Sequence, residues 1–227
     1  MTYVDTSIAT TPFLLKGDAA ATSRPAPVDT GNPELAPLLS VLFLMIDESQ
    51  SMVVNVTSAH PGAGTTTVAR SVAAAAAATG WCRVALLDAR TRVGRADDER
   101  GLIDDFERGE SPALRSINLG AIEVDTGPLT TSGRTVSRLD SVRKLYGTLR
   151  QRYSLIVVDS PAVFAGQQTL TLAAAADETV LVVEAERTAL ADVSRARTAL
   201  ERRGASVLGM VMNKSRSRIP ALFGRLA

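Results

Sequence analysis

The sequence predicts an α/β domain with a doubly wound, mostly parallel β-sheet flanked by helices. Apolar runs of strand length alternate with helical stretches along most of the 227-residue chain. The apolar runs lack polar alternation, which is typical of strands that are buried on both faces. A glycine-rich turn follows the first of these runs and precedes an alanine-rich helix. Strands and helices in this alternation build a parallel sheet through right-handed crossovers.

The predicted domain spans residues 33–214, and segments of different composition flank it. Residues 1–32 mix Thr, Ala, Ser, Pro and Gly without steady periodicity, so we expect a flexible N-terminal segment. Residues 215–227 form a short basic and apolar C-terminal tail. Two interpretations of this tail stay open: a final helix folded against its own domain, or an amphipathic segment lying on a membrane or partner.

The first predicted element is a helix that follows Pro33. Its apolar residues recur at helical spacing on one face, at Leu35, Leu38, Leu39, Leu42 and Ile46. This helix either packs on the domain or docks another subunit.

The remaining elements follow in alternation. Apolar and β-branched runs predict strands at 52–58, 83–89, 118–125, 154–161, 178–185 and 206–213. Helical spacing or alanine-rich composition predicts helices at 65–80, 102–109, 138–153, 168–177 and 189–204. Gly80 closes the first of these helices.

Composition excludes several classes of protein. Hydrophobic residues make up 45% of the chain and charged residues 22%, which is a globular balance. The net charge of +1 provides no global attraction to nucleic acid. The single cysteine, Cys82, excludes an intrachain disulfide. The apolar run from Val41 to Ile46 is far shorter than the roughly 20 residues of a membrane span, so we expect a cytoplasmic protein.

The stretch Ser58 to Thr67, "SAHPGAGTTT", is a glycine-rich turn between a predicted strand and a predicted helix. Gly62 and Gly64 let the backbone form a concave nest whose N–H groups, together with the helix N-terminus, attract an anion. The hydroxyl of Thr66 stands where such loops ligate Mg²⁺. On this stretch alone, a plain strand-to-helix turn is an equally good interpretation.

Two carboxylates are predicted at the same edge of the sheet. Asp159 ends the strand "LIVVD", where an acid holds Mg²⁺ through water, and Asp88 ends "VALLD", where it can orient a water or a metal-bound ligand. Ligands of open α/β sheets bind at the carboxyl ends of the strands, so the loop and both acids converge. Taken alone, either acid could instead be a helix N-cap.

These motifs, in this order, resemble the bacterial tyrosine kinases (BY-kinases) of capsule and exopolysaccharide systems. More broadly they are similar to the P-loop ATPases that position cell components. The similarity runs from about Pro33 to Asn213, with "VALLDARTR" matching the Walker A′ strand and "SLIVVDSPAV" the Walker B strand. The resemblance therefore implies a P-loop NTPase of the deviant Walker A type.

The resemblance also implies a set of site residues and ligands. ATP or ADP would bind through the loop and a strand-end asparagine: Gly62, Ala63, Gly64, Thr65, Thr66, Thr67 and, at the adenine ring, Asn213. Thr66 and Asp159 would hold Mg²⁺, and Asp88 would take a catalytic role.

The sequence departs from the family at two positions that carry charge. The family's loop reads Ser-x-x-Pro-Gly-x-Gly-Lys-Ser/Thr, and Thr65 replaces the lysine that bridges the β- and γ-phosphates. Arg90 replaces the second acid of the Walker A′ motif. Arg90 either substitutes for the lysine by touching phosphate, or pairs with Asp88 or Asp159 and blocks the metal's place. We favour blocking, because a guanidinium cannot organise an in-line transfer as Mg²⁺ does.

Two further departures concern assembly and phosphorylation. The self-association motif Glu-x-x-Arg-x-x-Arg would fall at Glu34, Pro37 and Ser40, so both arginines are absent. Ring assembly of the family type is not expected, although a homo-oligomer stays open. The only tyrosines are Tyr3, Tyr146 and Tyr153, so the tail has no phosphoacceptor.

The expected function is that of a cytoplasmic, BY-kinase-like and catalytically impaired subunit that is recruited to the inner membrane. It would regulate or scaffold the synthesis and export of a polysaccharide (capsule, exopolysaccharide or holdfast-type adhesin) by binding a membrane co-polymerase. One alternative is an active ATPase or tyrosine kinase that uses Arg90 or a partner's residue in place of the lysine. Another is a positioning ATPase that binds membrane through Phe223 and Leu226 of the tail.

Overall fold

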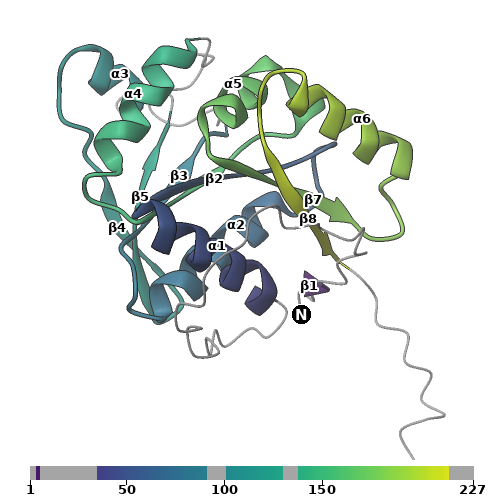
Figure 1. Ribbon diagram of the computed structural model, residues 1–227, viewed down its shortest axis with the longest axis horizontal. Helices are drawn as coiled ribbons and strands as arrows, with labels where there is room; N and C mark the ends of the chain where they lie inside the picture. The colour runs from purple at the N-terminus through teal and green to yellow at the C-terminus, as the bar shows by residue number, and fades with distance from the viewer. Residues whose placement is uncertain (1–3, 6–34, 91–100, 130–137, 215–227) are drawn as a thin grey trace, which may run out of the picture.

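The computed structural model describes residues 4–5, 35–90, 101–129 and 138–214 (Figure 1). Its strands are Val4–Asp5 (β1), Met52–Ser58 (β2), Val84–Asp88 (β3), Arg115–Leu119 (β4), Ile122–Pro128 (β5), Leu155–Asp159 (β6), Glu178–Glu184 (β7) and Val207–Asn213 (β8). They form one sheet in the order β1-β8-β7-β2-β6-β3-β5-β4. All neighbours pair in parallel except β1 on β8 and β4 on β5. The predicted α/β class with a mostly parallel sheet is confirmed.

Helices cover both faces of the sheet, as Figure 1 shows. They are Ala36–Ser49 (α1), Thr65–Ala78 (α2), Leu102–Glu107 (α3), Leu139–Leu149 (α4), Gln167–Ala175 (α5) and Leu190–Glu201 (α6). On the central strand β2, Val54 and Val56 pack into the cluster of buried residues that contains α1 and α2. The intervening Val53 packs into the cluster that contains α4. Side chains alternate across a strand, so both faces of β2 are apolar and both need a helix layer.

The structure corrects the strand that the sequence predicts at 118–125. This stretch is not one strand. It contains the end of β4, a two-residue turn and the first half of β5, and Leu119 pairs with Ile122 across the hairpin. Gly120 takes a φ of +69° at the turn, which glycine adopts without steric cost. The hairpin was missed because β4 is a largely exposed edge strand, so it has no apolar run to mark it.

The predicted first helix is α1, and its apolar face packs on the sheet. Leu39 and Leu42 are fully buried in the same cluster as α2 and β2. Val41 and Leu44 lie on the other face and are 42% and 52% exposed. None of the described helices combines the length and the apolar content that a membrane crossing requires.

The two flanking segments lie mostly outside the described residues. Of the predicted flexible segment 1–32, the structure describes only the short strand β1, which pairs with the end of β8. The predicted tail 215–227 lies wholly outside the described residues. The predictions of flexibility and of a membrane-binding tail therefore stay predictions.

Candidate functional site

The carboxyl ends of four strands meet at one edge of the sheet, and this edge carries the residues that the sequence predicts. Asp88 ends β3 and Asp159 ends β6, and the two are register partners on adjacent parallel strands. Ser58 ends β2 on the other side of β6, and Asn213 ends β8. Parallel strands finish at a common edge, so residues distant in sequence come together here.

The backbone between β2 and α2 forms the concave turn that its glycines predict. Gly62 and Gly64 have φ values of +92° and +93°, a region that other residues rarely adopt. A Cβ at Gly64 would collide with the side-chain amide of Asn213. The helix α2 begins directly afterwards at Thr65, so its first N–H groups are available to an anion.

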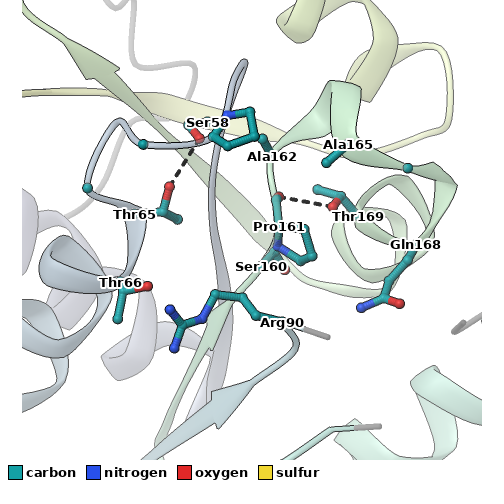
Figure 2. A pocket seen from close by; sticks show the side chains of 14 residues that line it. Ser58, Thr65, Thr66, Arg90, Ser160, Pro161, Ala162, Ala165, Gln168 and Thr169 are labelled. Atoms are coloured by element: carbon teal, nitrogen blue, oxygen red, sulfur yellow. Dashed lines mark hydrogen bonds between the residues drawn. The ribbon is translucent and has the colours of Figure 1, made fainter. Parts of the chain in front are cut away.

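A pocket of about 620 Å³ opens at this turn (Figure 2). One wall is the loop with the first turn of α2, and the opposite wall is the segment after β6. Residues of that second wall were missed from the sequence: Ser160, Pro161, Ala162, Ala165, Gly166, Gln168 and Thr169. The Thr169 hydroxyl donates a hydrogen bond to the Pro161 carbonyl over 3.0 Å, and the Gln168 amide donates one to the Ala89 carbonyl. The sequence signal for this wall is that the segment directly follows Asp159 at the end of a predicted strand, where ligands of such sheets bind.

Thr65 occupies the position where the resembling loops carry lysine. Its hydroxyl donates a hydrogen bond to the Ser58 hydroxyl over 3.1 Å, and Ser58 in turn donates to the His60 carbonyl over 2.9 Å. Figure 2 shows Thr65 pointing toward Ser58. A neutral hydroxyl that is already engaged within the loop brings no positive charge to the pocket.

Arg90 joins both strand-end carboxylates. Its Nε and one terminal nitrogen each lie 3.1 Å from Asp88, on different carboxylate oxygens, and its Nε lies 3.0 Å from Oδ2 of Asp159. The guanidinium points toward Thr66 on the first turn of α2 (Figure 2). Burial alone would lower the pKa of Arg90, but the hydrogen bond and charge of Asp88 and the charge of Asp159 raise it above its usual value. The guanidinium therefore stays charged and bridges the two acids.

Asp159 is the most buried acid of this edge, with a side chain only 4% exposed. The pKa of Asp159 is raised to about 6, because the effect of burial exceeds the opposing effects of the charge of Arg90 and a hydrogen bond from Thr66. Oδ2 of Asp159 makes the contact with Arg90. Its other oxygen, Oδ1, makes no hydrogen bond of standard geometry within the described residues. Near pH 7 the carboxylate is ionised and depends on Arg90 for its counter-charge.

Two consecutive residues at the end of β8 contact the loop. The amide nitrogen of Asn213 donates a hydrogen bond to the Ala63 carbonyl over 2.8 Å. The ammonium of Lys214 donates one to the Gly62 carbonyl over 2.6 Å. Lys214 was missed from the sequence because 152 positions separate it from Gly62.

His60 of the loop is not among the residues that line the pocket. Its Nε2 lies 3.0 Å from a carboxylate oxygen of Asp192 on α6, and its ring centroid lies 5.3 Å from that of Phe164. Phe164 also lies under Arg195 of α6. His60 therefore ties the loop to α6.

Comparison with known proteins gives concordant results. The candidate tyrosine-protein kinase EpsB of Ralstonia solanacearum is 31% identical over 208 residues, which are 84% of this chain. The tyrosine-protein kinase CpsD of Streptococcus pneumoniae is 24% identical over 172 residues, covering 71% of this chain and 75% of CpsD. The kinase domain of the Escherichia coli tyrosine kinase ETK superposes with a TM-score of 0.69 at 22% identity, over 88% of this chain and 84% of that domain.

The chain is a BY-kinase-like P-loop protein, similar to EpsB, CpsD and ETK. It spans only about a quarter (26%) of the length of EpsB. No protein-family profile matches it.

The two tyrosines that the structure describes are poorly placed for phosphorylation in this BY-kinase-like chain. Tyr146 is 1% exposed in the cluster between α4 and the sheet, where burial raises the pKa of its hydroxyl. Tyr153 is 6% exposed, and its hydroxyl donates a hydrogen bond to Asp125 over 2.8 Å. Tyr146 is therefore enclosed by the core, and the hydroxyl of Tyr153 is already engaged by Asp125.

The resemblance to BY-kinases implies that ATP and Mg²⁺ bind at the carboxyl edge of the sheet. The residues at this edge fit the two ligands differently. The pocket and the concave turn leave room for a nucleotide's phosphates. A cation already lies between the carboxylates that would hold Mg²⁺, because Arg90 contacts both Asp88 and Asp159. Among the described residues there is no group of three or more His, Cys, Asp or Glu side chains that could hold a metal. The residues present fit a nucleotide but not its metal.

Proposed function

We propose that this chain is a catalytically impaired BY-kinase-like subunit that scaffolds or regulates the synthesis and export of a bacterial polysaccharide. It acts at the cytoplasmic face of the inner membrane by binding a membrane co-polymerase. The family supplies the link to capsule and exopolysaccharide systems. The partner and the location follow from the same resemblance. Binding rather than phosphoryl transfer is its contribution.

One observation carries the proposal of impaired catalysis: Arg90 bridges Asp88 and Asp159. Phosphoryl transfer depends on a metal that neutralises the charge developing on the phosphates. An arginine held by two carboxylates cannot approach phosphate without giving up its side-chain contacts with both acids. Thr65 removes the second cation that the reaction needs.

The test measures ATP binding and hydrolysis by the purified chain with and without Mg²⁺. We expect Mg²⁺ not to raise the affinity for ATP, and we expect hydrolysis to stay at background. The double variant Thr65→Lys, Arg90→Asp restores the lysine and the acid of the family pattern. In this variant we expect Mg²⁺ to raise the affinity for ATP, because the guanidinium of Arg90 then no longer lies between the two acids.

The control for this experiment is Thr65→Ala, which removes the hydroxyl without adding charge. It should behave as the native chain does. Hydrolysis or tyrosine phosphorylation by the native chain at a rate typical of kinases, abolished by Thr65→Ala, would refute the proposal.

A second experiment tests the scaffold role in the source bacterium. Deleting the gene should lower polysaccharide output, and expressing the Asp159→Asn variant should restore it, because no metal-dependent step is needed. Restoration by the native chain but not by a stably folded Asp159→Asn variant would show that the carboxylate acts chemically.

A further inference from the structure

The loop that lacks its own lysine is contacted by a lysine from another part of the fold. Lys214 directly follows Asn213 at the end of β8. Its Nζ donates a hydrogen bond to the Gly62 carbonyl over 2.6 Å and lies 3.3 Å from a carboxylate oxygen of Glu184, the last residue of β7. A cation thus lies against the phosphate-binding turn.

The stem of Lys214 runs along the part of the loop that precedes Thr65. Its Cε lies 4.0 Å from the position that a Cβ on Gly64 would take, and Gly64 is the residue directly before Thr65. The lysine therefore reaches the neighbourhood of the missing charge from the opposite end of the chain.

The backbone of Lys214 is held in an unusual conformation that directs this side chain. Its φ is +62°, in the left-handed region that residues other than Gly, Asn and Asp seldom adopt. Its backbone N–H donates a hydrogen bond to the side-chain oxygen of Asn213 over 2.9 Å, and the amide of Asn213 is itself fixed on Ala63. The turn after β8 is thereby tied to the loop at two successive carbonyls.

The charge of Lys214 is less fully compensated than that of Arg90. Two carboxylates surround Arg90, whereas Lys214 shares Glu184 with Arg187, which lies 3.2 Å from the same oxygen. The side chain of Lys214 is 43% exposed, so it can reorient without breaking buried contacts. A lysine ammonium on a flexible stem can exchange a carbonyl for a phosphate oxygen.

We propose that Lys214 supplies the positive charge that this site offers to the phosphates of a nucleotide bound without metal. The inference rests on the proposed function, in which the pocket keeps its nucleotide but not its Mg²⁺. On binding, Nζ exchanges the Gly62 carbonyl for a phosphate oxygen and moves away from Glu184, which keeps its contact with Arg187. The ligand class is a nucleoside di- or triphosphate whose phosphates enter the concave turn.

The experiment measures the binding of ADP and of adenosine by calorimetry in the presence of EDTA. We expect Lys214→Met to weaken ADP binding by about tenfold or more, because a hydrogen bond between two charged groups is lost. Lys214→Arg should retain most of the affinity for ADP. Lys144→Met on the exposed surface of α4 is the matched control and should stay within about twofold of the native chain. Adenosine, which has no phosphate, should bind all the variants alike.

Two results would overturn the inference. If Lys214→Met lowers the melting temperature of the ligand-free protein but leaves the affinity for ADP within twofold, Lys214 only braces the loop. If the native chain binds no ADP in EDTA, no phosphate is held there by Lys214. Neither result touches the scaffold role, which the Mg²⁺ and complementation experiments decide separately.

Discussion

At the scale of single residues, the ionisation of Asp159 depends on Arg90 because burial disfavours a charged carboxylate. The pKa of Asp159 is raised from 3.8 to about 6, so the folded state binds the proton more tightly than the unfolded chain does. Ionising Asp159 therefore lowers stability as the pH rises from about 4 to 6. Above about pH 6 the free energy of unfolding falls no further from this ionisation. The contact with Arg90 makes the loss smaller.

Replacing Arg90 by methionine should lower stability in a pH-dependent way. Without the guanidinium the pKa of Asp159 rises further, so the variant loses about 1–2 kcal/mol of unfolding free energy at pH 8 and much less at pH 4.5. The range allows for the partial exposure of Arg90, which is 35%. Urea unfolding at the two pH values measures the difference.

The matched control is Arg197→Met, which removes an exposed ion pair with Glu201 on α6. It should change the unfolding free energy by less than about 0.5 kcal/mol at either pH. An Arg90→Met loss that is equal at pH 8 and pH 4.5 would mean that the guanidinium packs rather than compensates the charge of Asp159.

Gly64 and Gly62 provide a second residue-scale prediction, because they share one backbone conformation and differ in their surroundings. A Cβ at Gly64 meets the Asn213 amide, whereas a Cβ at Gly62 meets nothing within 4 Å. We expect Gly62→Ala to cost about 1 kcal/mol from backbone strain and Gly64→Ala to cost at least about 2 kcal/mol. If both variants lost the same unfolding free energy in urea, the side chain of Asn213 would move aside without cost.

At the scale of elements, the sequence predicts best where burial imposes a pattern. Strands β2, β3, β6 and β7 are buried on both faces, so their apolar runs are continuous and mark them clearly. The hairpin of β4 and β5 was not predicted as two strands, because the exposed β4 carries no such run. A continuous apolar run marks a strand only where the strand is buried, and the edge strand β4 is largely exposed.

The helix α1 gives an element-scale prediction about packing. Leu39 is fully buried, so Leu39→Ala should cost about 2–4 kcal/mol through lost burial and a cavity. Leu44 is 52% exposed on the opposite face, so Leu44→Ala should cost less than about 1 kcal/mol. Thermal unfolding of both variants measures the contrast. If Leu44→Ala were the more destabilising of the two, the orientation of α1 described here would be wrong.

At the scale of the whole molecule, the site is a consequence of topology. The sequence predicts the loop, Asp88 and Asp159 as one site, because each lies at the end of a parallel strand, and the resemblance adds Asn213. The contact of Arg90 with both acids was one of two open interpretations, since only the folded geometry decides which partners a long side chain reaches. Lys214 could not be found from spacing, because its neighbourhood to Gly62 arises from the order of β8, β7 and β2 in the sheet.

The position of Arg90 between Asp88 and Asp159 also predicts how the whole molecule responds to metal. Excess Mg²⁺ should leave the melting temperature of the ligand-free chain unchanged, because a ligand stabilises only by binding the folded state. ADP in EDTA should raise the melting temperature, and adding Mg²⁺ should not raise it further. The Thr65→Lys, Arg90→Asp variant is the comparison, and there the nucleotide with Mg²⁺ should stabilise more than the nucleotide alone.

We infer that Arg90, which lies between the two strand-end acids, excludes the metal from the site. The most direct test of this inference is a crystal structure grown with ATP and Mn²⁺, whose anomalous scattering locates the metal. We expect Arg90 to remain in contact with Asp88 and Asp159 and no anomalous peak to lie between them. A strong peak at that position, bound to Thr66 and the γ-phosphate with Arg90 displaced, would contradict the account.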